Sequence, residues 1–178
     1  MIPTPQITLR DARAEDAPRL AELHVRTFRE THKGGPEVEF REQQWREKFR
    51  SGQLVFCVVL ETDSRELIGF ASGELHRAEP PGYGGELNKI YLLREWQGRG
   101  LGHRLLCASA ARFLRAGIPS MLLFGDAASR SNGFYEAMGG TRLLAPSGEF
   151  HGGYGWSDLT RLQSICGSRT VARANDPV

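Results

Sequence analysis

One short stretch of the sequence decides the fold: Gln97-Gly98-Arg99-Gly100-Leu101-Gly102, which lies between a predicted strand and the clearest predicted helix. Glycines let the backbone curl tightly there, and the N-terminus of the helix adds partial positive charge to its N–H groups. Such a turn suits an anion such as a pyrophosphate, to which Arg99 can add a charge-assisted contact. The glycine spacing differs from a dinucleotide fingerprint, and the Gly-Lys-Ser/Thr of a Walker A loop is absent. The spacing alone therefore leaves open both the ligand and a plain strand-to-helix turn.

Strands and helices are predicted on both sides of this turn. Apolar and β-branched runs predict strands at 7–9, 54–60, 67–76, 86–93, 121–124, 141–144 and 154–159. Helical spacing predicts helices after Asp16, which we expect as an N-cap, and at 37–50, 98–117 and 131–138. Three consecutive strands favour antiparallel pairing, whereas the strand-helix-strand unit around 98–117 requires a parallel crossover. The sequence therefore predicts a mixed α/β sheet.

The composition is that of an ordinary globular protein. The 178 residues include 23 Lys+Arg and 21 Asp+Glu, and this net charge of +2 does not favour binding to nucleic acid or to a membrane surface. The longest uncharged apolar run, 54–60, is far shorter than the roughly 20 residues of a membrane helix. We expect one domain over residues 1–163 and a loose polar tail over 164–178.

The cysteines and the first residues bear on metal binding and location. Cys57, Cys107 and Cys166 form no C-x-x-C pair and do not adjoin a histidine cluster, so we expect neither a metal site nor a disulfide framework. The first ten residues lack a basic start followed by an apolar stretch, which argues against a secretory signal. The expected location is therefore cytoplasmic.

Three segments together carry a resemblance to a known family. The turn resembles the Q/R-x-x-G-x-G/A signature of the GNAT superfamily of N-acetyltransferases, and residues 87–96 look like the strand that precedes it. Residues 132–140, Asn-Gly-Phe-Tyr-Glu-Ala-Met-Gly-Gly, resemble the second motif of that family. The resemblance implies a GNAT-like fold: a central mixed, mostly antiparallel sheet of about seven strands, flanked by about four helices. It also implies a splayed strand pair that holds coenzyme A.

The resemblance implies a set of coenzyme-binding residues. In this family the turn binds the pyrophosphate of coenzyme A, which implies contacts from Gln97, Gly98, Arg99, Gly100, Leu101, Gly102 and His103. The backbone of Ile90, Tyr91 and Leu92 is expected to pair with the pantetheine arm as if the arm were an added strand. Asn132 is expected to reach the pantetheine or nearby backbone, and the alternative is an amide that stabilises a turn or a helix end.

Acetyl transfer to an amine needs a base, a stabiliser for the oxyanion and an acid for the departing thiolate, because only the neutral amine attacks. Glu86 precedes Gln97 by eleven positions, the spacing of the catalytic glutamate in histone-type members, so the resemblance implies a base that acts directly or through water. The alternative is a solvated carboxylate at a strand end. Tyr135 aligns with the tyrosine beside the coenzyme sulfur and is expected to be the acid, the alternative being a core residue. The backbone N–H of Leu92 is expected to bind the oxyanion.

The resemblance therefore implies an acetyl-CoA-dependent N-acetyltransferase. It would move the acetyl group to a primary amine of a small molecule or a peptide by direct attack in a ternary complex, with acetyl-CoA as co-substrate and no metal. One alternative is a non-catalytic acyl-CoA-binding or sensing module, which would need neither Glu86 nor Tyr135. Another is an unrelated nucleotide-binding domain. Members of the family often dimerise, so a homodimer is among the expected assemblies.

Overall fold

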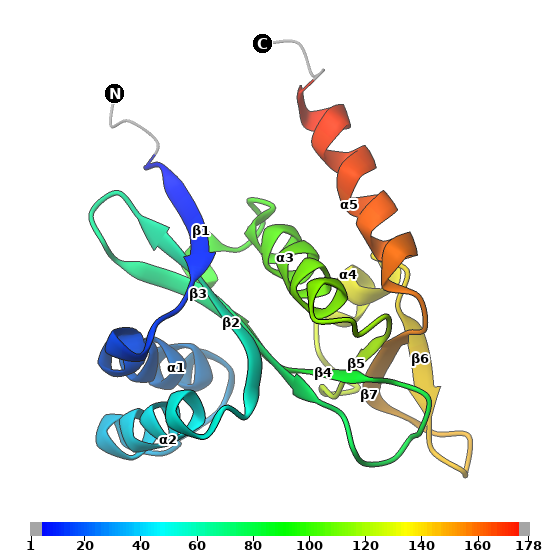
Figure 1. Cartoon of the computed structure of the whole chain (residues 1–178), viewed down its shortest axis with the longest axis horizontal. Coiled ribbons are helices and arrows are strands. Elements are labelled where there is room, and N and C mark those ends of the chain that lie inside the picture. Colours follow the sequence, from blue (N-terminus) through cyan, green and yellow to red (C-terminus); the bar gives the residue numbers. More distant parts are fainter. Residues whose placement is uncertain (1–4, 175–178) are drawn as a thin grey trace. The chain divides into compact units, whose positions relative to one another are not determined.

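The computed structural model describes residues 5–174, with side chains as far as Ser168, and its elements are labelled in Figure 1. In chain order they are β1 (Ile7–Asp11), α1 (Ala17–Thr31), α2 (Val38–Ser51), β2 (Leu54–Thr62), β3 (Leu67–Leu75), β4 (Gly85–Leu92), α3 (Leu101–Arg115), β5 (Met121–Leu123), α4 (Asn132–Ala137), β6 (Thr141–Leu144), β7 (Phe150–Trp156) and α5 (Leu159–Ala174). Two short 3-10 helices precede α1 and α3, at Ala14–Asp16 and Arg94–Trp96. Among the described residues, none of the helices combines the length and the apolar character needed to cross a bilayer.

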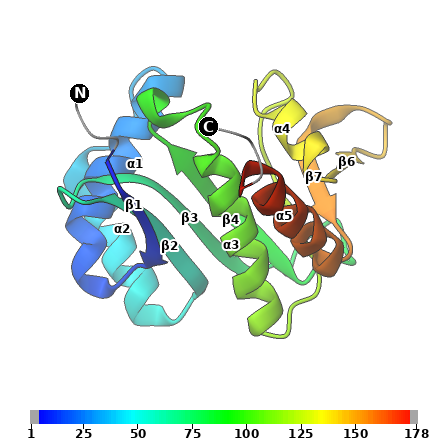
Figure 2. The ribbon, with the colours of Figure 1, turned by 90° about the horizontal axis from the view of Figure 1, so that it is seen from above.

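The strands form one mixed sheet. Their order is β1-β2-β3-β4-β5-β7-β6. Figure 2 shows β1, β2 and β3 beside one another. β1 runs antiparallel to β2, and β7 lies antiparallel between β5 and β6. The parallel pair is β4 with β5, which α3 connects, and its pairs are Gly85 with Met121 and Glu86 with Leu122. The predicted mixed and mostly antiparallel sheet of seven strands is confirmed, as is the parallel crossover through the helix after the glycine turn.

The chain divides into two compact units. The first comprises the chain up to Gly73 together with Lys89–Ser109, and the second comprises Glu74–Asn88 and the chain from Ala110 onward. β4 and α3 each contribute residues to both units. The glycine turn therefore belongs to the first unit, whereas Glu86, Asn132 and Tyr135 belong to the second.

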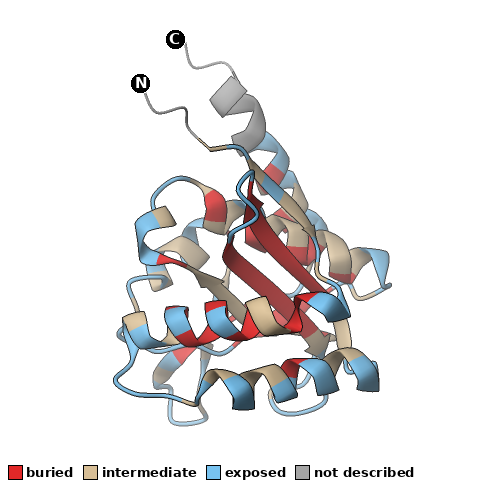
Figure 3. Cartoon of the chain, turned by 90° about the vertical axis from the view of Figure 1, so that its left-hand side faces the viewer, coloured by how far each residue is buried: buried red, intermediate tan, exposed pale blue. Residues whose placement is uncertain are grey.

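The first unit packs two helices against buried strands. Figure 1 shows α1 and α2 on one side of β1–β3, and Figure 3 shows how completely β2 and β3 are buried. Helix α1 buries Leu20, Leu23 and His24, and α2 contributes Trp45. These positions recur at helical spacing, so one apolar face of α1 meets the strands while its other face stays polar.

A network of ion pairs links β1, the start of α1 and β2 in this unit. Asp16 stands at the N-cap of α1, as expected, but its side chain does not cap the helix. Its carboxylate instead accepts hydrogen bonds from Arg10 Nη1 and from the backbone N–H of Arg13, both at 2.8 Å. Arg10 Nε also donates to Glu61 on β2 at 2.8 Å, and Arg19 Nη2 donates to the same carboxylate at 2.9 Å. The hydrogen bond from Arg10 is the main reason why the pKa of Glu61 falls to about 2.

The structure differs from the sequence predictions at several element ends. The described part of the chain contains five α-helices where about four were expected, because residues 159–174 form α5, which includes most of the tail expected at 164–178. The missed signals are Asp158, which accepts the Thr160 N–H at 2.9 Å, and a buried stripe of Leu159, Leu162 and Cys166. Residues 175–178 of the expected tail lie outside the described residues. Helix α3 begins at Leu101 and not at residue 98, because the preceding glycines adopt left-handed backbone angles. β7 begins at Phe150, four residues before the predicted strand.

Candidate functional site

The glycine turn is shaped by its backbone. Gly98 and Gly100 have φ angles of 75° and 76°, in the left-handed region that side chains other than hydrogen disfavour. The Gly100 carbonyl accepts the N–H of Arg104 at 3.2 Å, so the helical hydrogen bonds begin at Gly100. The first N–H groups of a helix have no acceptor within it. The turn therefore directs main-chain donors toward the space before α3, as an anion site requires.

Two side chains hold the turn in place. Gln97 Nε2 donates to the Leu92 carbonyl at 3.1 Å, which ties the turn to the end of β4. The guanidinium carbon of Arg99 lies 4.9 Å from the centre of the Trp96 ring, a cation–π distance. Arg99 is exposed, so its charge remains available to a ligand while the ring restrains its position.

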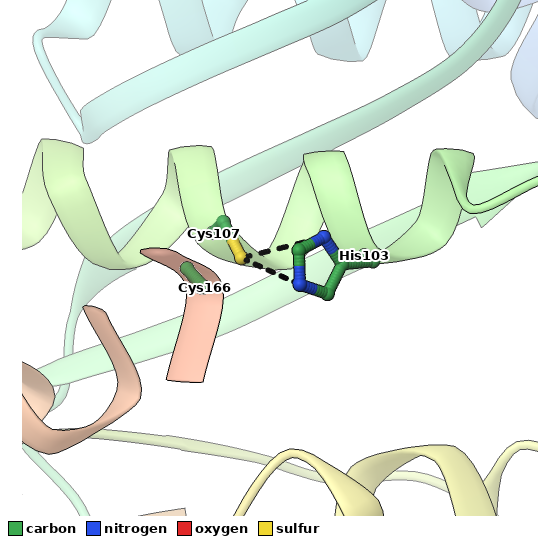
Figure 4. Close-up of side chains that lie close together, drawn as sticks. All are labelled: His103, Cys107 and Cys166. Carbon is green, nitrogen blue, oxygen red and sulfur yellow. Dashed lines mark hydrogen bonds between the residues drawn. The ribbon is translucent and has the colours of Figure 1, made fainter. Parts of the chain in front are cut away.

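The His103 side chain lies along helix α3. Its ring nitrogens are 3.6 and 3.8 Å from Sγ of Cys107, one turn further along the helix (Figure 4). The His103 side chain therefore packs against its own helix beside Cys107.

The end of β4 lies beyond the pairing of this strand with β5. That pairing is confined to Gly85 and Glu86, although β4 continues to Leu92. Ile90, Tyr91 and Leu92 are partly exposed. β4 therefore continues beyond the residues that pair with β5.

Tyr91 anchors this end of β4 to the core of the first unit. Its ring stacks on Phe70 with centroids 5.5 Å apart and lies 5.5 Å from His24. Burial lowers the pKa of His24 to about 3, with a smaller contribution from the positive charge of Arg41. His24 is therefore neutral and too weak a base to take a proton from an amine, and it serves as a buried core residue.

The second unit holds Glu86 between two polar partners. His76 Nδ1 lies 3.3 Å from Oε2 of Glu86, and Asn88 Nδ2 lies 3.4 Å from Oε1. The glutamate side chain is 26% exposed, so a substrate can still reach it. Glu86 is thus a positioned carboxylate at the start of β4 and not a freely solvated one.

Sequence reasoning missed both partners of Glu86. Asn88 could have been found, because residues two apart on a strand share one face. His76 comes from the segment after β3, ten residues earlier, and no spacing rule links it to Glu86.

Tyr135 lies within an aromatic group. Its ring centroid is 5.4 Å from that of Tyr154 and 6.3 Å from that of Trp156, and Phe134 is its neighbour on α4 at 5.3 Å. Tyr135 is half-buried. Packing in the core therefore explains why an aromatic ring stands here, while a chemical role rests on its hydroxyl.

Asn132 stabilises the loop after β5. Its Nδ2 donates to the carbonyl oxygens of Asp126 at 3.1 Å and of Ala127 at 2.8 Å. This is the turn-stabilising role that the sequence left as the alternative to a coenzyme contact.

Comparison with known proteins places this geometry in context. The model of the acetyltransferase (GNAT) family matches residues 17–140. The chain is 31% identical over 169 residues to YuaI, an uncharacterised N-acetyltransferase of Bacillus subtilis (strain 168), with 89% of this chain and 98% of that protein covered.

Solved structures are similar in fold. The PaiA N-acetyltransferase of Thermoplasma acidophilum, in complex with coenzyme A, has a TM-score of 0.62 at 21% identity and covers 84% of this chain and 98% of its own. The acetyltransferase YncA of Salmonella typhimurium, solved with acetyl-CoA, has a TM-score of 0.66 at 18% identity and covers 86% of this chain and 94% of its own. At these sequence identities, the structural similarity shows a shared fold and nothing about the substrate.

Proposed function

The chain belongs to the acetyltransferase (GNAT) family, and from that premise we propose that it transfers the acetyl group of acetyl-CoA to a primary amine of a small molecule or a peptide. Transfer occurs by direct attack of the amine on the thioester within a ternary complex. The observation that carries this proposal is the turn before α3, where two left-handed glycines and a helix N-terminus present main-chain donors to an anion.

The coenzyme is held mainly by backbone groups. The N–H groups of residues 98–103 receive the pyrophosphate, and the exposed guanidinium of Arg99 adds charge. Gln97 contributes by fixing the turn to β4 through the Leu92 carbonyl. The pantetheine arm pairs with Ile90, Tyr91 and Leu92, since β4 extends beyond its pairing with β5. Asn132 contributes by ordering the loop after β5. Acetyl-CoA is the co-substrate, and the reaction uses no metal.

The chemistry is assigned to two side chains and one main-chain group. Glu86 is the base, directly or through a water molecule, because its carboxylate lies between two polar side chains and remains reachable. Tyr135 is the acid that protonates the departing thiolate. The backbone N–H of Leu92 stabilises the oxyanion of the tetrahedral intermediate. The matched family model runs through both units of the chain, which supports a single acetyltransferase domain.

A direct assay tests this proposal. Purified protein is incubated with acetyl-CoA and a panel of amines, amino acids and peptides, and the free thiol released is measured against controls without an acceptor. Amine-dependent thiol release supports the proposal. Tight binding of coenzyme A without transfer to any amine would instead favour an acyl-CoA sensor. Thermal stabilisation by ATP or NAD but not by coenzyme A would indicate a nucleotide-binding domain.

A further inference from the structure

The second unit buries a histidine beside Glu86. Only 2% of the His76 side chain is exposed, against 26% of Glu86. His76 Nδ1 lies 3.3 Å from Oε2 of Glu86, and its Nε2 lies 3.1 Å from the carbonyl oxygen of Pro80. Both ring nitrogens therefore face oxygen atoms.

The Pro80 carbonyl determines the tautomer of this imidazole. A carbonyl oxygen can only accept a hydrogen bond, so Nε2 must carry a hydrogen and donate it. In the neutral ring, Nδ1 is then a lone pair that faces a carboxylate oxygen. That contact becomes a hydrogen bond only when one proton lies between Nδ1 and Oε2. The arrangement is thus built to take up a single proton.

We propose that His76 is a positioning residue for Glu86, and that the His76–Glu86 pair holds the proton removed from the amine. This inference rests on the proposed function, in which Glu86 is the base. The ammonium N–H bond breaks as an O–H bond forms at Oε2, and the lone pair of Nδ1 accepts a hydrogen bond from that O–H. The electron pair of the N–H bond stays on the amine for attack, and the charge of the pair changes from −1 to zero.

The surroundings fix the pair. Asn88 Nδ2 approaches the other carboxylate oxygen at 3.4 Å, which restrains rotation of the carboxyl group. The ring of Phe124 lies with its centroid 6.2 Å from that of the imidazole. Glu86 is a titratable group that faces the His76 ring directly. Arg77 and Glu79, which follow in sequence, are exposed and opposite in charge.

Two substitutions separate the functions of the two nitrogens. In His76→Asn, the amide takes the place of Nδ1 but is far less basic than an imidazole nitrogen, and it no longer reaches the Pro80 carbonyl. In His76→Gln, the longer amide can reach the Pro80 carbonyl and leaves Oε2 without its acceptor. We expect kcat to fall about 10-fold to 100-fold in both near pH 7, with unchanged affinity for coenzyme A.

The pH profile distinguishes a proton-holding role from a structural one. The deficit should shrink to less than about threefold near pH 9.5, because a larger share of the amine then arrives unprotonated and needs no base. A deficit of the same size at every pH, or no deficit, would overturn the proposal. The matched control is His151→Asn, since His151 also meets a glutamate, Glu149 at 3.7 Å, but is 69% exposed. It should keep the wild-type rate at each pH.

A second measurement does not depend on turnover. In NMR titrations of the resting protein, the Glu86 carboxyl carbon and the His76 ring nitrogens should change in common steps, as in a coupled pair. Independent titrations would overturn the proposal even if the enzyme is active. If the wild-type protein binds coenzyme A and acetylates no amine, the proposed function fails, whereas common steps would still support the shared proton.

Discussion

The glycine turn of the first unit and the His76–Glu86 pair of the second are proposed to meet their ligands by different means. The turn uses main-chain donors whose direction is set by local φ angles at Gly98 and Gly100. The pair depends on side chains from segments ten residues apart in sequence. A main-chain site tolerates the loss of many side chains but not a change of backbone, and the reverse holds for the pair. Substitutions at the two places should therefore affect different kinetic quantities.

The largest effect is expected at the pair. Glu86→Gln keeps the shape of the side chain but removes the negative charge that accepts a proton, so kcat should fall about 100-fold to 1,000-fold. Affinity for coenzyme A should be unchanged, as measured by calorimetry. Glu149→Gln, at an exposed glutamate, is the control. A wild-type kcat in Glu86→Gln would show that Glu86 is not the base, and the contrast between the pair and the turn would then no longer hold.

A smaller loss is expected when the proposed acid is removed. Tyr135→Phe keeps the ring that packs on Tyr154 and Trp156 but deletes the hydroxyl, so kcat should fall about 10-fold to 100-fold without a change in coenzyme affinity. The matched variant is Tyr154→Phe, which loses a 2.9 Å hydrogen bond to Glu136. It should cost about 1 kcal/mol of stability and leave kcat near the wild-type value. Equal rates for the two variants would mean that Tyr135 serves packing alone.

Substitutions in the turn should lower the affinity for coenzyme A and leave kcat unchanged. Gly98→Ala forces a side chain into φ 75°, which costs about 1 kcal/mol and shifts the N–H donors, so affinity for coenzyme A should fall about 10-fold. Gly52, at the C-terminus of α2, has φ 68° and, like Gly98, open space where a Cβ would lie. Gly52→Ala should cost similar stability but leave coenzyme affinity intact. If both variants bind coenzyme equally well, main-chain geometry at the turn does not govern binding.

The smallest effect is expected at Arg99. Its guanidinium is exposed and lies over Trp96, so salt screens its attraction for a phosphate. Arg99→Ala should weaken coenzyme binding about threefold at low ionic strength, and the difference should fade as salt is added. A loss larger than that of Gly98→Ala would reverse the ranking of backbone over side chain at the turn.

Features set by neighbours in sequence could be predicted, and features set by distant neighbours could not. The glycine turn, the crossover helix and the strand that bears Glu86 all follow from local patterns, and the structure contains them. The contact between His76 and Glu86 arises only when the chain folds back on itself. Asp16 shows a related case: its place at the start of α1 could be predicted, but its carboxylate binds Arg10 on β1, and no spacing rule predicts that contact.

Helix α5 shows a different limit. Its residues 159–174 are mixed in character, and the buried stripe is narrow. With so few apolar positions, the segment has the polar composition expected of a tail. The capping side chain of Asp158 was the more reliable signal.

The charges that join β1 to β2 make the first unit sensitive to acid. Glu61 has its pKa lowered to about 2 in the folded chain, from an ordinary value of 4.5. Its carboxylate therefore contributes stability in full above about pH 4.5, and that contribution disappears as the pH falls toward 2. At pH values near 2, β1 should therefore open before the apolar core of the unit unfolds. Hydrogen exchange at Ile7–Asp11 that stays as slow at pH 2.5 as at neutrality, after correction for intrinsic rates, would contradict this order of events.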